Sequence, residues 1–287
     1  MKRTSESTLN PLRLWDRFFH RPMTSSEWSV LAFIRVGYSV LLLINILVWW
    51  PDLETWFGET GVMPLENSRK IVDPDTVTIF QILPRTSFVL WSCYILLIVN
   101  LICLMFGFYS RVQCFFIFVL YTSFCHRNPL IFDGEDILFR LMAFYLFLAP
   151  IGNHFSINRL WNRKEEEHRN KPVWPLRLIQ IQTSMVLFFS GLEKLGGVEW
   201  RNGTALYYVS RLDDFFCRFP IPEFLFKSLV LVSLMTWCAV LVEISVPILI
   251  WFRKSRWLAL IIVIGFHLTL DYTMNLNLFQ WLSLIHI

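Results

Sequence analysis

The chain has 287 residues, of which 55% are hydrophobic and 17% charged, and its net charge at pH 7 is +4. Apolar runs of about twenty residues recur along it, which is typical of helical proteins that cross a membrane several times. The basic residues lie mainly between the runs, where they act as topology signals, so the composition argues against nucleic-acid binding.

Residues 1–27 form a basic N-terminal segment with five Lys and Arg side chains. Leu12, Trp15 and Phe19 follow helical spacing among these charges, which predicts an amphipathic helix lying on the membrane surface. The alternative, a disordered basic tail, fits residues 1–8 better. The first apolar run begins at Trp28 and is too long for the core of a signal peptide, so we expect it to remain in the membrane.

The apolar runs predict an all-α polytopic membrane protein, a bundle of about seven to eight transmembrane helices. The predicted spans are 28–50, 87–107, 112–126, 136–150, 174–195, 228–251 and 257–275. An eighth apolar run begins at Leu278 and reaches Ile287, where the sequence ends. Ten helical residues cover about 15 Å, half a bilayer, so we expect this last helix to be incomplete.

The segments between the predicted spans are polar or aromatic. Residues 51–86 form a loop rich in acidic side chains, and residues 151–173 are the most charged stretch of the chain. Residues 196–227 alternate aromatic and charged side chains, which indicates structure at the membrane interface.

The distribution of Lys and Arg predicts the orientation. With the N-terminus in the cytosol, fifteen basic residues fall on the inner side and eight on the outer side. The positive-inside rule therefore predicts a multi-pass membrane protein with a cytoplasmic N-terminus. The two halves of the chain share no repeat, which argues against a transporter built from inverted repeats.

Two charged residues are predicted to lie deep within spans, where charges are costly. Arg35 lies about seven residues from the inner end of the first span, and Glu243 about eight residues from the inner end of the sixth. Because their depths match, we predict that they form an ion pair, whose role is more structural than functional.

A second group of ionisable residues gathers toward the predicted outer ends of the spans. Side chains four residues apart share one face of a helix, which applies to Asp136 with Arg140 and to His267 with Asp271. The group consists of His126, Arg127, Glu135, Asp136, Arg140, Glu193, Lys194, His267 and Asp271. An outward-facing pocket containing these acids, bases and guanidinium groups could perform acid/base chemistry.

Lys194 has two interpretations. A lysine in the last turn of a helix complements the helix dipole and can extend its amine to the membrane surface. Alternatively, it serves as a base, which requires an environment that favours the neutral amine. The spacing of residues favours neither interpretation over the other.

Several motifs resemble the HTTM (horizontally transferred transmembrane) domain, the membrane portion of vitamin K-dependent gamma-carboxylases. The strongest is Gly191-Leu192-Glu193-Lys194-Leu195, followed by the segment 199–205. Further similar segments are 33–37, 59–64, 127–131, 134–136, 243–247, 266–268 and 275–279. The resemblance predicts an HTTM-like transmembrane domain over residues 28–287, preceded by the basic segment 1–27.

The resemblance also implies a role for Lys194. In the carboxylases the matching motif contains a lysine pair, and its second lysine is regarded as the base that deprotonates reduced vitamin K. Lys194 matches this second lysine, whereas Glu193 stands in place of the first and Glu135 in place of a supporting histidine. The large luminal domain that recognises the propeptide is also absent from this sequence. These departures argue against carboxylation of glutamate itself.

We therefore expect a carboxylase-like membrane enzyme whose pocket faces the lumen, the periplasm or the exterior. Its predicted catalytic residues are Lys194, Arg140, His267 and Asp271, with a quinol such as reduced vitamin K, or another lipid-soluble molecule, as substrate. Lys194 would remove a proton, Arg140 and His267 would stabilise negative charge, and Asp271 would orient His267. No cysteine pair or histidine cluster predicts a metal site.

Two alternatives from other classes remain. One is a non-enzymatic membrane partner for the export or maturation of a secreted peptide, with segments 51–86 and 196–227 as the contact surface. The other is a transporter, which charged residues within the spans would permit. In each case the predicted partner is the lipid bilayer, together with a lipid-soluble quinol or a secreted peptide.

Overall fold

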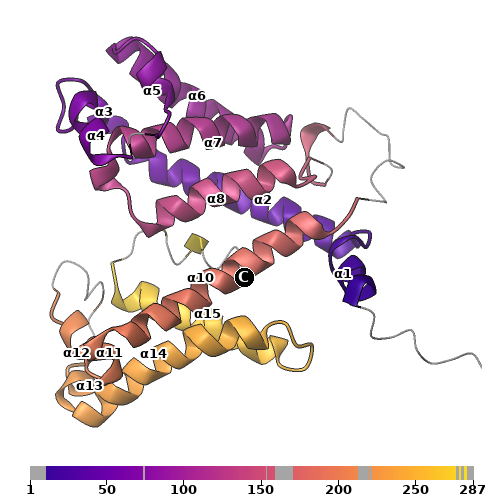
Figure 1. Cartoon of the computed structure of the whole chain (residues 1–287), viewed down its shortest axis with the longest axis vertical. Helices are drawn as coiled ribbons and strands as arrows, with labels where there is room; N and C mark the ends of the chain where they lie inside the picture. Colours follow the sequence, from indigo (N-terminus) through magenta and orange to yellow (C-terminus); the bar gives the residue numbers. More distant parts are fainter. Residues whose placement is uncertain are drawn as a thin grey trace, which may run out of the picture. The chain divides into compact units, whose positions relative to one another are not determined.

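The structure is a computed structural model, and it describes residues 11–73, 75–152, 154–158, 171–212, 219, 222–275, 278 and 281–282. The predicted tail at 1–8, much of the charged stretch 151–173 and most of the run after Leu278 lie outside these residues. The described residues form helices and no β-strand, and an isolated bridge joins Pro22 to Pro172. Figure 1 shows this all-helical fold, which confirms the predicted fold class.

A helix occupies each of the seven predicted spans. They are α2 (Ser25–Leu47), α6 (Ser87–Met105), α7 (Ser110–Arg127), α8 (Gly134–Leu148), α10 (Trp174–Gly196), α14 (Leu229–Leu249) and α15 (Arg256–Thr273). By length and composition, α2, α6, α14 and α15 could each cross a membrane. The apolar runs therefore predict the helices, and the exact number of spans stays a prediction.

The chain divides into two compact units, residues 1–179 and 180–287, with the boundary inside α10. In the first unit α6 packs on α2 and α7, and α8 packs on α2 and α7. The core of this unit contains the fully buried side chains of Tyr38, Tyr94, Phe124 and Phe139. A buried tyrosine needs a partner for its hydroxyl group. Tyr38 Oη donates to the carbonyl of Phe139 at 3.1 Å, and Tyr94 Oη donates to that of Ile46 at 2.9 Å.

The predicted acidic loop 51–86 is folded into short helices, which the apolar periodicity did not predict. They are η1 (Trp50–Asp52), α3 (Leu53–Phe57), α4 (Leu65–Ile71) and α5 (Ile79–Ile82), and both α4 and α5 pack on α7.

Arg127, at the end of α7, anchors this loop, because its side chain is only 3% exposed and donates several hydrogen bonds. Its guanidinium group donates to the carbonyls of Met63 and Gly58 and lies 3.2 Å from the carboxylate of Glu59. These contacts join two segments, 59–64 and 127–131, that resemble the HTTM domain.

Arg35, in α2, has a comparable structural role. It is fully buried and donates to three main-chain carbonyls of the segment that follows α8, those of Ile151, His154 and Phe155. Since a buried guanidinium needs acceptors, these carbonyls account for its position within a largely apolar helix.

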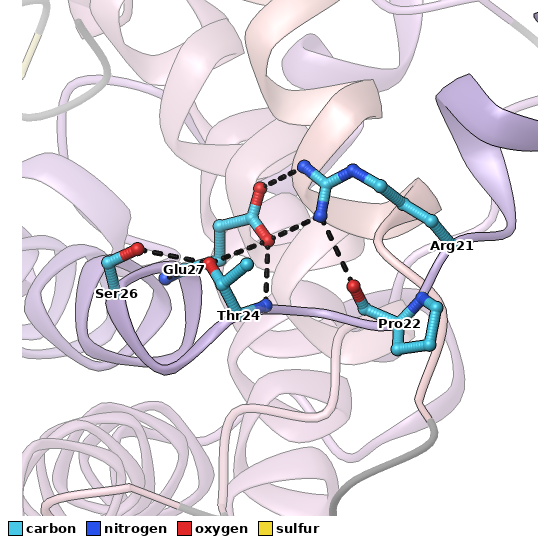
Figure 2. A network of polar contacts seen from close by, with 5 residues as sticks. All are labelled: Arg21, Pro22, Thr24, Ser26 and Glu27. Atoms are coloured by element: carbon cyan, nitrogen blue, oxygen red, sulfur yellow. Dashed lines mark hydrogen bonds and ion pairs between the residues drawn. The ribbon is translucent and has the colours of Figure 1, made fainter.

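Polar contacts also fix the start of α2 (Figure 2). Thr24 and Glu27 form a capping box, in which the Thr24 side chain accepts from the Glu27 N–H and the Glu27 carboxylate accepts from the Thr24 N–H. Arg21 donates to both carboxylate oxygens of Glu27, with Nη1 at 2.8 Å from one of them. This hydrogen bond raises the pKa of the Arg21 guanidinium further above its already high value.

In the second unit, α14 is the element on which the others pack. The helices α12 (Ala205–Val209), α13 (Phe224–Lys227) and α15 each contact it. Val246 of α14 forms a buried cluster with Ala259 and Val263 of α15, and Leu187 of α10 packs against that cluster. Three long helices therefore share one apolar core in this unit.

Replacing Arg127 tests whether this side chain holds the loop. Arg127→Gln leaves the carbonyls of Met63 and Gly58 without their charged donor, so we expect a loss of about 2 to 4 kcal/mol in the stability of the loop. Limited proteolysis of the protein in detergent should then cleave within residues 51–86 much faster.

Arg69→Gln is the matched control, because Arg69 lies in the same loop and is exposed. We expect its cleavage rate to match the wild type. Equal cleavage rates in the Arg127 variant and the control would contradict the anchoring role.

Candidate functional site

Lys194 lies in the last turn of α10 and forms an ion pair with Glu243 of α14. Lys194 Nζ is 2.7 Å from Glu243 Oε2, and the two side chains are 24% and 8% exposed. Lys194 Nζ also donates to Ser190 Oγ at 2.8 Å, and Ser190 Oγ donates to Glu243 Oε2 at 3.3 Å. The amine, hydroxyl and carboxylate therefore form a closed triangle of polar contacts on two helices.

The close approach of α10 and α14 makes this triangle possible. A β-carbon added at Gly191 would lie 2.7 Å from Ile244 Cγ1 and 3.1 Å from Glu243 Cβ. The shorter distance is below any real contact of a β-carbon, so a larger residue at this position would force the two helices or their side chains to shift. Gly191 follows Ser190 directly, so this close contact brings the neighbouring polar side chains within hydrogen-bonding distance.

The segment after α10 covers the amine. Trp200 belongs to α11 (Val198–Arg201), and Lys194 Nζ lies 5.4 Å from the centre of its ring, a distance at which a cation is attracted to the aromatic face. Gly203 follows with φ of 71° and approaches Ser233 of α14 so closely that a β-carbon would lie 2.4 Å from the Ser233 hydroxyl oxygen. The motif 199–205 therefore supplies an aromatic cover and a turn that only glycine allows.

The position of Glu243 along α14 defines the depth of the ion pair. Glu243 lies fourteen residues after Leu229, which corresponds to about 21 Å along the helix axis. The main-chain N–H of Leu206 donates to Thr236 Oγ1, so α12 lies beside the first half of α14. Lys194, although near the end of α10, is therefore paired well inside the apolar length of α14.

Arg35 and Glu243, which were predicted to form an ion pair, each have other polar partners in the structure. Glu243 contacts Lys194 and Ser190, whereas Arg35 donates to main-chain carbonyls of its own unit. The prediction rested only on the similar depths of the two residues in their spans. Two residues at a similar depth need not lie on helices that contact each other. The Arg35–Glu243 pair stays a prediction without a contact to support it.

His267 lies in α15 and is almost fully buried, at 1% exposure. Its Nδ1 lies 2.9 Å from the carbonyl oxygen of Val263, one turn earlier, so Nδ1 carries a proton and donates. The main chain of α15 thereby fixes the ring, a role that the sequence assigned to Asp271. The predicted catalytic roles of both residues stay predictions.

Arg140 and Asp136 belong to the first unit, and their side chains have separate partners. Asp136 accepts hydrogen bonds from the Tyr121 hydroxyl and from the main-chain N–H of Asp133. Arg140 Nη1 lies 3.3 Å from Nε2 of His126. The spacing of four residues therefore does not produce an ion pair here. Lys194 belongs to the second unit, and a contact of Arg140 with it stays a prediction.

The structure also contains a pocket that the sequence did not predict. It has a volume of about 310 Å³ and lies where α4, α5 and the end of α7 meet, with Leu65, Ser68, Arg69, Val72, Asp73, Thr78, Gln81 and His126 in its walls. Only His126 among these was predicted as a site residue, because the others come from a loop whose fold was not predicted. Among the described residues, no group of His, Cys, Asp and Glu could hold a metal ion.

Substituting Gly191 tests the close contact of α10 and α14. Gly191→Leu places a side chain where even a β-carbon would be too close, so we expect a loss of about 1 to 3 kcal/mol and a lower melting temperature in detergent. Gly265→Leu is the control, because a β-carbon at Gly265 in α15 meets no atom within 4 Å. A similar loss of stability in both variants would contradict the account.

Comparison with known protein families matches the HTTM domain over residues 23–287. No solved structure matches the chain. The matched residues include α10, α11 and α14, and therefore Lys194, Ser190, Glu243 and Trp200. The match covers nearly the whole chain and agrees with an all-helical structure that contains long apolar helices. The chain belongs to the HTTM domain family.

Proposed function

We propose that this HTTM-domain protein is a carboxylase-like membrane enzyme in which Lys194 removes a proton from a lipid-soluble substrate of the quinol type. The contact of Lys194 Nζ with Glu243 Oε2 at 2.7 Å is the observation that carries this proposal. It joins two groups that can exchange a proton, whereas the buried side chains of Arg35 and Arg127 donate mainly to main-chain carbonyls.

The ion pair supports a defined sequence of proton transfers. In the resting state the ion pair consists of the Lys194 ammonium group and the Glu243 carboxylate. Moving that proton to Glu243 converts the charged pair into a neutral pair without changing the net charge of the site. The free amine of Lys194 can then accept the proton of a substrate hydroxyl group, which breaks an O–H bond and forms an N–H bond. Ser190, which contacts both groups, keeps them aligned.

The surroundings of the amine favour a lipid-soluble substrate. The ion pair lies beside the apolar length of α14, and Trp200 supplies an aromatic face next to Lys194. Phe189 and Leu192 of α10 are exposed apolar side chains close in sequence to Ser190 and Lys194. A planar aromatic molecule that dissolves in the bilayer matches this environment better than a charged, water-soluble one. Reduced vitamin K is a molecule of this class, and the resemblance of the chain to the membrane portion of vitamin K-dependent carboxylases favours it as the quinol to test.

The other predicted catalytic residues have subsidiary roles in this proposal. His267 would stabilise the negative charge left on the substrate oxygen, and Asp271 would support His267, whereas the charge-stabilising role of Arg140, in the first unit, stays a prediction. Because Nδ1 of His267 already donates to the Val263 carbonyl, its Nε2 can donate to an anion only when the ring is protonated. Lys194 and Glu243 therefore carry the chemistry, and His267 can assist only as an imidazolium.

The folded loop 51–86 favours the second candidate function, a membrane partner in the export or maturation of a secreted peptide. Val77 and Ile82 are 76% and 75% exposed on this loop, although it is held in place by Arg127. An anchored loop that exposes apolar side chains is suited to contact another chain.

The experiment must separate chemistry from stability. Replacing Lys194 alone leaves the buried Glu243 charge unpaired, which costs about 3 to 5 kcal/mol and could by itself abolish activity. The double variant Lys194→Gln/Glu243→Gln replaces the ion pair by two amides that can bond to each other and to Ser190. We expect this variant to fold with a melting temperature close to that of the wild type.

The activity measurement uses the full chain in lipid nanodiscs that contain reduced vitamin K, and it follows the oxygen-dependent loss of the quinol. The wild type should accelerate this loss, and the double variant should lower the rate about 100-fold, since it has no base. Glu193→Gln is the control, because Glu193 is exposed and adjacent, and it should retain the wild-type rate. Unchanged turnover in the folded double variant would exclude Lys194 as the base.

A further inference from the structure

The helix α1 (Pro11–Phe19) has an exposed apolar face and no buried residue. Leu12 and Trp15 are 77% and 61% exposed. At 100° per residue its six apolar residues fall within an arc of about 160°, and its polar side chains occupy the opposite arc. The six apolar residues are Pro11, Leu12, Leu14, Trp15, Phe18 and Phe19, and the polar ones are Arg13, Asp16 and Arg17.

The connection to α2 places this face at the edge of the membrane. Only residues 20–24 separate α1 from α2, a helix long and apolar enough to cross a bilayer. Five residues reach at most about 18 Å, so α1 lies near the level at which α2 leaves the apolar core.

Three sets of contacts restrain the connection. Arg21 is bonded to both carboxylate oxygens of Glu27 in the first turn of α2 (Figure 2). The main-chain N–H groups of Met23 and Val173 donate to the carbonyls of Lys171 and Arg21. The guanidinium of Arg177 lies 4.8 Å from the centre of the Phe18 ring. Together these contacts tie α1 to the beginnings of both α2 and α10.

The charges on the polar arc indicate which surface α1 meets. Arg13 and Arg17 are exposed, and no ion pair is formed by either within the part of the chain that the structure describes. The acidic residue of α1, Asp16, is instead 3.3 Å from His20. The face that looks away from the apolar arc is therefore basic, which complements negatively charged headgroups.

We infer that α1 is an interfacial anchor that lies in the plane of the membrane, with its apolar arc in the bilayer and Arg13 and Arg17 bound to anionic phospholipid headgroups. The clamp formed by Arg21 and Glu27 fixes the angle at which α1 leaves α2. Since α10 begins at the same restrained junction, the anchor also holds the first turn of the helix that carries Lys194 near its other end. The inference does not depend on the proposed chemistry.

The test measures hydrogen–deuterium exchange of the full chain in two kinds of nanodisc, one of phosphatidylcholine alone and one that also contains phosphatidylglycerol. Each basic side chain near an anionic surface strengthens binding about fivefold, so two should slow exchange of residues 11–19 about 25-fold in the anionic bilayer. We expect Arg13→Gln/Arg17→Gln to abolish this difference, and 1 M salt to reduce it.

Arg253→Gln/Lys254→Gln is the matched control, because it removes two exposed basic residues from the turn between α14 and α15. It should leave the difference at residues 11–19 intact. Equal exchange of α1 in neutral and anionic bilayers would overturn the inference. An effect of the control variant equal to that of the Arg13/Arg17 variant would overturn it as well, because the difference would then follow total charge.

Discussion

A charge that enters the apolar interior of a membrane protein must find a partner, and this requirement accounts for the contacts of the buried Arg35 and Arg127 and of the partly buried Lys194. Arg35 meets it with main-chain carbonyls of the segment after α8, and Arg127 meets it with main-chain carbonyls and the Glu59 carboxylate of the loop 51–86. Lys194 meets it with a carboxylate and a hydroxyl group on two helices. A carbonyl cannot accept the proton of a guanidinium, whereas a carboxylate can accept that of an amine. The same constraint thus accounts for two structural anchors and for the ion pair of Lys194 with Glu243.

Much of the fold could be predicted from the sequence, because hydropathy is a local property. Each of the seven apolar runs corresponds to a helix whose ends differ from the prediction by a few residues. The helical spacing of Leu12, Trp15 and Phe19 likewise corresponds to the amphipathic helix α1. The folding of residues 51–86 could not be predicted, since it depends on contacts made across sixty or more residues by Arg127. Such long-range contacts leave no periodic pattern in the sequence.

The site was predicted only in part, for a similar reason. The family resemblance pointed to Lys194, whereas the contact of Lys194 with Glu243 was not predicted, because Glu243 was matched to Arg35 only by its depth in the span. Depth gives the level of a charge and does not show which helices are neighbours. The signal that could have identified the pair is Gly191, next to Ser190 and three residues before Lys194, because a glycine on an otherwise large-residue helix marks a close helix contact.

The central claim is that Lys194 and Glu243 form a charged pair in the resting protein. Infrared spectroscopy measures this directly, because protonated and ionised carboxyl groups absorb at well-separated frequencies. The difference between the wild type and Glu243→Gln, both in nanodiscs at neutral pH, should show the bands of an ionised carboxylate that disappear in the variant. A band of a protonated carboxyl group assigned to Glu243 would contradict the account.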